Sequence, residues 1–289
     1  MIDAQHWSAL RSQLAEDGAI CLRQAFTKAD MTLADAAFQW MIDHPGPGAE
    51  KRYRHEPAVF YESTGYTPHE QVFADLLRQT PVVSMAQHFC QSENIWYLGE
   101  QLFWKYGGRA RRTPWHQDLS YLPFKGDSII GIWMSLGDLP RHACLEFIRG
   151  SHNRTLYNGA SYLDLEDDTH PLYPDSDMPR LPDIEANRQD WDILSWELER
   201  GDMVVFHLGT LHGGGGTTPG LERRSLTLRF FGEDAVWTNP LPDPDPEAFS
   251  ARRGRAVREA DARPVNSPVP GEPMHQNGQF VELSKFSLS

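Results

Sequence analysis

The sequence has few cysteines and few basic residues. Three cysteines, widely spaced in 289 residues, are too few for a disulfide framework or a cysteine-rich zinc site. Lysine and arginine number 27 against 40 aspartate and glutamate residues, and the net charge of −13 disfavours binding to nucleic acid or to an anionic membrane surface. We therefore expect no nucleic-acid partner and a small molecule as the ligand.

Long apolar runs are missing as well. No stretch approaches the roughly 18 apolar residues of a membrane helix, and residues 1–6 have neither the basic nor the apolar region of a secretory signal. We expect a cytoplasmic protein with no membrane partner. A chain of this length can bury a substantial core, and β-barrels of this size commonly form one domain. We therefore expect a single domain over residues 1–289.

The first part of the chain, to about residue 94, has the spacing of a helical flank with one strand. The strand is expected at residues 19–23, and a surface loop is expected to begin at residue 45. Apolar residues at helical spacing predict helices over residues 4–16, 29–42, 68–78 and 82–90.

Residues 95–237 have the character of a barrel. Short aromatic and β-branched runs alternate with glycine-containing turns, and residues 128–136 are apolar enough for a strand that is covered on both faces. Residues 163–191 are rich in aspartate and proline and form an insertion, of the kind that often serves as an active-site lid. Residues 238–289 are rich in proline, which predicts an extended tail with one short helix.

One short motif concentrates metal-binding side chains. His116 and Asp118 are separated by one residue, so on an extended strand both would point to the same face. His212 would complete two histidines and one carboxylate, a facial set that leaves coordination positions of Fe(II) open. Taken alone, His116 and Asp118 more often form an ordinary hydrogen bond, and Zn²⁺ accepts the same three ligands.

Arg223 and Arg224 follow His212 along the chain. A guanidinium is a fork with a permanent charge, suited to a carboxylate such as that of 2-oxoglutarate. Alternation along a strand allows only one of the two to face the interior. Such an arginine has no use in a zinc hydrolase, which favours iron in the site.

Several segments, in their order and spacing, resemble the phytanoyl-CoA dioxygenase family. The resemblance covers roughly residues 13–237 and implies a mainly β fold with flanking helices, the double-stranded β-helix, which is a cupin-like jelly roll. It also implies Fe(II) and 2-oxoglutarate as cofactors, with dioxygen as a further substrate. The segments are Thr113 to Asp118, Gly131 to Leu136, Leu145 to His152, and Gly201 to His207 continuing to Arg223–Leu226.

The resemblance also selects between neighbouring candidates. The family's distal ligand is followed by glycine, so His212 is expected to bind the metal with His116 and Asp118, and His207 is expected to be a core or supporting histidine. Family spacing favours Arg223 as the partner of 2-oxoglutarate. The cosubstrate pocket is further expected to include Trp133, Thr113 and Lys105.

The expected activity is hydroxylation, or desaturation, of a small organic molecule with release of succinate and CO₂. Two alternatives stay open. A cupin-like metal-dependent hydrolase or isomerase would need no 2-oxoglutarate, and an inactive barrel acting as a binding module would need no metal. The arginines before the motif, Arg109, Arg111 and Arg112, are expected to keep a loop soluble, in preference to binding an anionic substrate.

Overall fold

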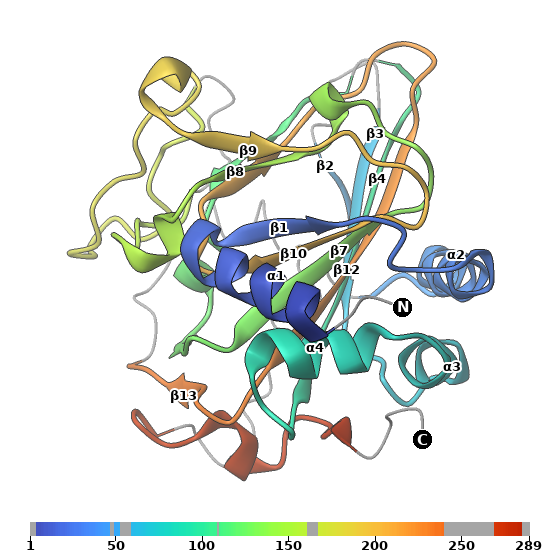
Figure 1. Cartoon of the computed structure of the whole chain (residues 1–289). Coiled ribbons are helices and arrows are strands. Elements are labelled where there is room, and N and C mark those ends of the chain that lie inside the picture. The colour runs from blue at the N-terminus through green and yellow to red at the C-terminus, as the bar shows by residue number, and fades with distance from the viewer. Residues whose placement is uncertain are drawn as a thin grey trace.

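The protein is a sandwich of two facing antiparallel sheets with helices outside the larger one (Figure 1). The computed structural model describes residues 4–46, 49–52, 59–108, 110–160, 167–239 and 269–284. All strand pairs within these residues are antiparallel, and strands distant in the sequence lie side by side, such as β1 with β10. The expected double-stranded β-helix is confirmed.

The larger sheet has seven strands in the order β1-β10-β7-β12-β4-β3-β2, and the smaller has four in the order β5-β11-β8-β9. Strands β13 and β6 form a separate pair. The strands are β1 (Ala19–Leu22), β2 (Glu50–Arg52), β3 (Val59–Gly65), β4 (Trp96–Tyr106), β5 (Thr113–His116), β6 (Phe124–Lys125), β7 (Ile129–Ser135), β8 (Leu145–Ile148), β9 (Ile193–Ser195), β10 (Met203–His207), β11 (His212–Gly214), β12 (Arg223–Phe231) and β13 (Val236–Trp237).

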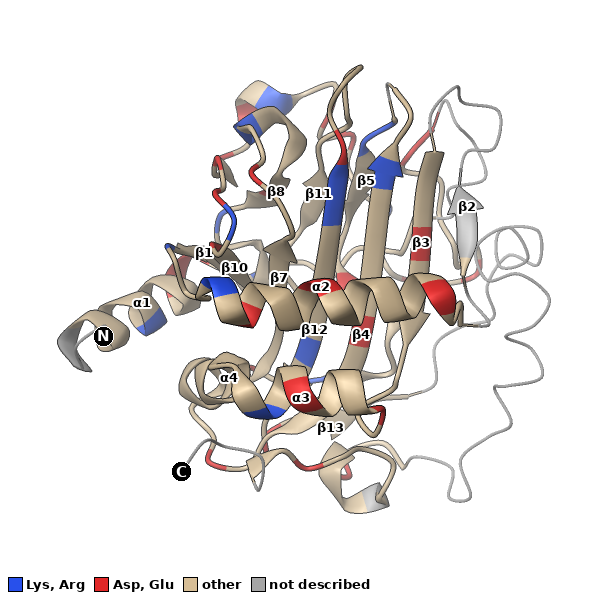
Figure 2. Cartoon of the chain, turned by 90° about the vertical axis from the view of Figure 1, so that its right-hand side faces the viewer, with Lys and Arg blue, Asp and Glu red and all other residues tan. Residues whose placement is uncertain are grey.

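Four helices pack on the larger sheet, and Figure 2 shows α2 and α3 crossing its outer face. They are α1 (Ala4–Asp17), α2 (Lys28–Asp43), α3 (Gln71–Gln79) and α4 (Val82–Cys90). Thr27 caps α2: its side chain accepts from the Asp30 amide, and the Asp30 carboxylate accepts from the Thr27 amide at 2.8 Å. None of the described helices is long and apolar enough to cross a membrane.

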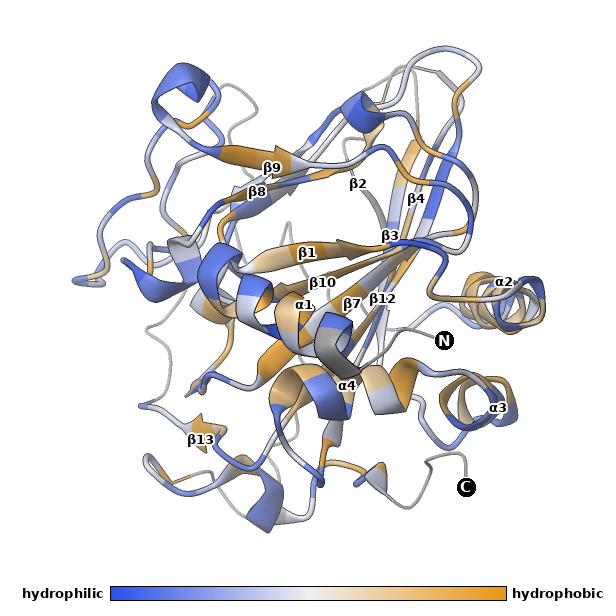
Figure 3. Ribbon diagram, viewed as in Figure 1, coloured by the Kyte–Doolittle hydropathy of each residue, from blue (hydrophilic) through white to orange (hydrophobic). Residues whose placement is uncertain are grey.

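Strand β7 is buried along its whole length, as its apolar sequence predicts. The helices cover one of its faces and the smaller sheet covers the other, so both sets of alternating side chains are apolar or small. In Figure 3 the apolar colour is concentrated along β1, β10 and β7, while the loops at the periphery are hydrophilic.

Two strands, β2 and β3, lie between the expected start of a surface loop at residue 45 and the helix expected from residue 68. Residues 59–65 pair with β4 along their whole length. Phe60 is buried, but Glu62, Ser63 and Thr64 interrupt the apolar alternation on which a strand prediction depends. Pairing with β4, a contact distant in the sequence, determines this strand.

The described part of the proline-rich tail, residues 269–284, packs on the barrel. Met274 and Leu283 are fully buried. The Leu283 amide donates to the Ile95 carbonyl at 2.8 Å, and the Tyr97 amide donates to Val281 at 3.0 Å. These residues include a 3₁₀ turn, Met274–Asn277, and their packing on the barrel is not predicted by the sequence. Residues 240–268 and 285–289 lie outside the described part.

We predict that Leu283→Ala lowers the free energy of unfolding by about 2 to 5 kcal/mol, because it leaves a cavity in the core. Val269, half exposed in the same segment, is the matched control, and Val269→Ala should change stability by roughly 0.5 kcal/mol or less. Urea unfolding measures both. Equal, small effects would show that this segment does not belong to the core.

Candidate active site

The two histidines of the predicted metal set lie opposite each other in the smaller sheet. His116 ends β5, His212 begins β11, and the two residues are direct partners in this antiparallel pair. Their ring centres are 4.2 Å apart. His212 lies in a short strand, because β11 pairs with β5 on one side and with β8 on the other. Pairing on both sides fixes the His212 backbone.

Asp118 reaches the histidines from a 3₁₀ helix, residues Asp118–Tyr121, and not from the strand itself. Its Oδ1 lies 3.4 Å from Nε2 of His116 and 3.9 Å from Nε2 of His212. His116 and Asp118 are therefore close because of this 3₁₀ helix, and not because they alternate along one strand as the sequence predicts. The Gln117 side chain anchors the turn instead, since its Nε2 donates to the Gly209 carbonyl at 2.7 Å.

Backbone carbonyls orient both imidazoles. Nδ1 of His116 lies 2.9 Å from the Pro114 carbonyl, and Nδ1 of His212 lies 2.9 Å from the Thr210 carbonyl. A carbonyl only accepts, so each Nδ1 carries the proton and each Nε2 presents its lone pair toward Asp118. Donor atoms of the three side chains lie within 4.8 Å of one another. Two imidazole nitrogens and one carboxylate oxygen fit Fe(II).

Electrostatics favour the same protonation states. Burial raises the pKa of Asp118, but the guanidinium of Arg229 outweighs it and holds that pKa well below its usual range. Burial, together with the neighbouring His116, lowers the pKa of His212 to about 3. At neutral pH the site therefore contains a charged carboxylate and a neutral His212, the forms that bind a metal.

His207 is not part of this cluster. Its Nε2 donates to the Gly126 carbonyl at 3.0 Å, and its Nδ1 accepts from the Gly209 amide at 3.0 Å. Both ring nitrogens are thus used by the backbone, which places His207 among the supporting histidines.

Two buried cations of the larger sheet meet near the other end of β5 and β11. Arg223 and Lys105 are partners across β12 and β4. Arg223 Nη1 donates to the Gly215 carbonyl at 3.1 Å, and Lys105 Nζ donates to the same oxygen at 3.2 Å. Burial lowers the pKa of Arg223 to about 10 and lowers that of Lys105 well below its usual value. No carboxylate in the described residues forms an ion pair with either, so the pocket is suited to an anion.

Unpartnered donors surround these cations. Arg223 Nε, Trp133 Nε1 and Ser225 Oγ are buried and have no hydrogen-bond partner. Such donors are costly unless a ligand satisfies them, and a carboxylate would accept from several at once. Thr113 adds a hydroxyl, which accepts from Lys105 at 3.2 Å. The structure thus brings together all four expected cosubstrate residues.

Ser225 is not among the residues expected in this pocket, although its spacing from Arg223 in the sequence indicates that it faces the same side. It follows Arg223 by two positions on β12, so both side chains lie on the same face. Arg224 lies between them on the opposite face, exposed, with its guanidinium 6.0 Å from the Phe38 ring on α2.

Glycines make room for the buried arginine. A Cβ on Gly214 would lie 2.9 Å from Nη1 of Arg223, and a Cβ on Gly215 would lie 2.0 Å from the His142 carbonyl. The glycine run after His212 is therefore required by the packing of Arg223 and of the backbone around it.

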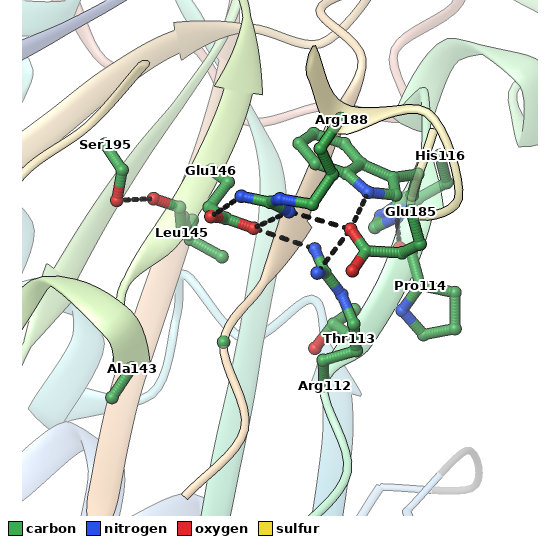
Figure 4. Close-up of polar contacts among 12 residues, drawn as sticks. Arg112, Thr113, Pro114, His116, Ala143, Leu145, Glu146, Glu185, Arg188 and Ser195 are labelled. Atoms are coloured by element: carbon green, nitrogen blue, oxygen red, sulfur yellow. Dashed lines mark hydrogen bonds and ion pairs between the residues drawn. The ribbon is translucent and has the colours of Figure 1, made fainter. Parts of the chain in front are cut away.

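A network of two arginines and two glutamates joins the insertion to the strand of His116 (Figure 4). Glu146 pairs with Arg112 at 2.9 Å and with Arg188 at 2.6 Å. Glu185 pairs with both arginines, at 2.5 and 2.8 Å, and accepts from Trp115 Nε1 at 2.6 Å. The insertion therefore holds β5 on both sides of Thr113.

The insertion is only in part the expected lid. Leu181 and Ile184 pack with Trp115, which points away from the face that bears His116. Leu172 and Tyr173 pack instead with Tyr121, whose ring centre is 6.1 Å from that of His116. One part of the insertion thus covers the outer face of the smaller sheet, and another part borders the metal site. Residues 163–166 lie outside the described part.

The loop arginines also differ from expectation. Arg111 forms an ion pair with Asp168 of the insertion, and Arg112 belongs to the network. Both side chains are mostly buried, so they hold the insertion in place and do not simply keep a loop soluble. Arg109 lies outside the described residues.

We predict that Glu146→Leu lowers the free energy of unfolding by roughly 1.5 to 3 kcal/mol, because two arginines lose charged hydrogen bonds. Asp192, a two-thirds exposed partner of Arg149, is the control, and Asp192→Leu should cost about 0 to 1 kcal/mol. Chemical unfolding at low salt measures both. Equal losses would show that the network contributes no more than a surface ion pair.

Several known proteins are similar to this chain. It is 28% identical over 130 residues to the human peroxisomal phytanoyl-CoA dioxygenase, an alignment that covers 44% of this chain and 36% of the human protein. A probable phytanoyl-CoA dioxygenase of Caenorhabditis elegans is 28% identical over 134 residues, which cover 44% of this chain and 39% of that protein. The chain thus spans little more than a third of the length of these relatives.

Solved structures share the fold. A crystal structure of the epimerase SnoN in complex with Fe³⁺, alpha ketoglutarate and nogalamycin RO has a TM-score of 0.68 and 16% identity, covering 97% of this chain and all of that one. EctD from S. alaskensis, in its apo form, has a TM-score of 0.61 and 17% identity, covering 89% of this chain and 86% of that one.

The family model decides the identification. The model described as Phytanoyl-CoA dioxygenase (PhyH) matches residues 14–225, well over half of the chain and almost the range of the resemblance seen in the sequence. The matched range contains the His-x-Asp motif, the distal histidine and both buried cations, so iron and 2-oxoglutarate agree with the donors of the site. The chain belongs to the phytanoyl-CoA dioxygenase family.

Proposed function

We propose that the protein is an Fe(II)- and 2-oxoglutarate-dependent oxygenase that hydroxylates, or desaturates, a small organic molecule with release of succinate and CO₂. One observation carries the proposal: the buried cations Lys105 and Arg223 contact Thr113 and Gly215, at the end of β5 and β11 opposite the metal set. Thr113 and His116 are the ends of β5, and the partner of Thr113 on β11 is Gly214, next but one to His212. Three residues of strand separate the two sites by roughly 10 Å. A five-carbon dicarboxylate fits between them.

The residues of the chain then have distinct roles. His116, Asp118 and His212 would hold the metal, while Arg223 and Lys105 would bind the distal carboxylate of 2-oxoglutarate. Iron, when bound, supplies the reduction of dioxygen coupled to oxidation of the cosubstrate and the substrate. Phe147 and Phe206 pack their rings 5.8 and 4.9 Å from that of His212 and exclude water from this side of the site.

Aromatic side chains border the site next to His116. Tyr121 lies beside His116, and Tyr173 of the insertion packs against Tyr121. These rings suit a small organic substrate with an apolar portion.

The test is formation of succinate from 2-oxoglutarate, with and without Fe(II), followed by mass analysis of candidate substrates. The proposal predicts iron-dependent succinate and products heavier by one oxygen or lighter by two hydrogens. A hydrolase or isomerase would leave 2-oxoglutarate intact, and a binding module would consume nothing. A product of unchanged mass formed with succinate would replace hydroxylation by epimerisation.

A further inference from the structure

Arg229 contacts only one of the two oxygens of the Asp118 carboxylate. Its Nε donates to Oδ2 at 2.9 Å, and its Nη2 lies 2.9 Å from the same oxygen. The other oxygen, Oδ1, faces Nε2 of His116 at 3.4 Å and Nε2 of His212 at 3.9 Å. One oxygen is thus held by the guanidinium, and the other is presented to the metal position.

A hydrogen-bonded chain holds Arg229 in turn. Arg229 Nη2 donates to Oε1 of Gln101 at 2.5 Å, and Gln101 Nε2 donates to Oε1 of Glu62 at 2.6 Å. These residues come from β12, β4 and β3, which are neighbours in the larger sheet. The guanidinium has two acceptors in fixed directions, so it cannot rotate away from Asp118 without losing both.

Strand β12 therefore contributes one arginine to each end of the site. Arg223 and Arg229 are six positions apart, so they lie on the same face of the strand. Arg223 contributes to the anion pocket and Arg229 reaches the metal carboxylate. Only Arg223 belongs to the pattern that identified the site in the sequence.

We propose that Arg229 is a positioning residue of the metal centre: it holds Asp118 as a ligand through one oxygen, and Gln101 and Glu62 hold Arg229. The role of Arg229 rests on the proposed function in one respect only: the three ligands must bind a metal. The guanidinium also repels a cation, which opposes its orienting effect. Loss of a residue that orients a ligand typically weakens metal affinity tenfold to a hundredfold, so orientation outweighs repulsion.

The experiment measures Mn²⁺ affinity by calorimetry in the absence of turnover. We expect Arg229→Leu to raise the Kd for Mn²⁺ about tenfold to a hundredfold. Arg229→Lys keeps the charge but not the forked guanidinium, so its Kd should lie between that of the unmodified protein and that of Arg229→Leu. Arg224→Leu, on the exposed face of the same strand, is the matched control and should stay within about twofold.

A second variant separates positioning from folding. Gln101→Leu leaves the Arg229 and Asp118 pair intact but removes its support, so it should weaken Mn²⁺ binding several-fold while the metal-free protein keeps its unfolding temperature. A folded Arg229→Leu protein with unchanged or tighter Mn²⁺ binding would overturn the proposal. If Arg229→Leu does not fold, unchanged Mn²⁺ affinity in both Gln101→Leu and Arg229→Lys would overturn the proposal. Succinate formation tests the proposed function separately, since metal binding can persist in an inactive protein.

Discussion

Replacing His212 by alanine should abolish turnover and metal binding. The substitution removes one of two imidazoles whose Nε2 atoms face the Asp118 carboxylate, and no other histidine in the described residues can reach that position. The metal contributes several kcal/mol to the rate, so its loss should lower kcat/KM on the order of a thousandfold or more. Metal content after dialysis and the rate of succinate formation are the two measurements.

His207→Ala is the matched control for this prediction. His207 lies on β10 and bonds only to backbone groups, so its removal should reduce stability but leave appreciable metal affinity. Full iron occupancy in His212→Ala, together with loss of iron in His207→Ala, would contradict the assignment of the third ligand.

The ligand set could be predicted from the sequence because the family motif specifies residue types and spacing. The local conformation behind it could not. Asp118 meets His116 through a 3₁₀ turn that Gln117 anchors to Gly209, a contact between segments far apart in the chain. The strand that bears His212 exists because β5 and β8 pair with it on both sides, and a stretch of His-Gly-Gly has no strand propensity of its own.

Residues that support the site were harder to predict. Glu62, Gln101 and Arg229 each belong to a different strand, and only the pairing of β3, β4 and β12 brings them into one row. The same holds for the network that joins Glu146 to Arg188 of the insertion. Charged residues in a sequence give no sign of which partner they will find, so the sequence alone predicts a solvated side chain for Arg112.

Alternation along β12, in contrast, makes the orientation of its arginines predictable from the sequence alone. It requires one of two neighbouring arginines to face inward, and family spacing selects Arg223. The structure places Arg223 in the interior with 1% of its surface exposed, and Arg224 outside. The role of Arg223 toward 2-oxoglutarate stays a prediction, and a single pair of variants can test it.

Arg223→Leu should raise the KM for 2-oxoglutarate about tenfold to a hundredfold, because it removes a charged hydrogen-bonded pair worth roughly 1.5 to 3 kcal/mol. Binding should be weakened and not abolished, since Lys105 keeps a second buried cation beside the same Gly215 carbonyl. Arg224→Leu should leave this KM nearly unchanged. Steady-state succinate formation at varied 2-oxoglutarate gives both values, and unfolding curves show whether each variant is folded. A KM that rises in Arg224→Leu and stays constant in Arg223→Leu would mean that the cosubstrate binds elsewhere, because the buried pocket contains Arg223 alone of the two.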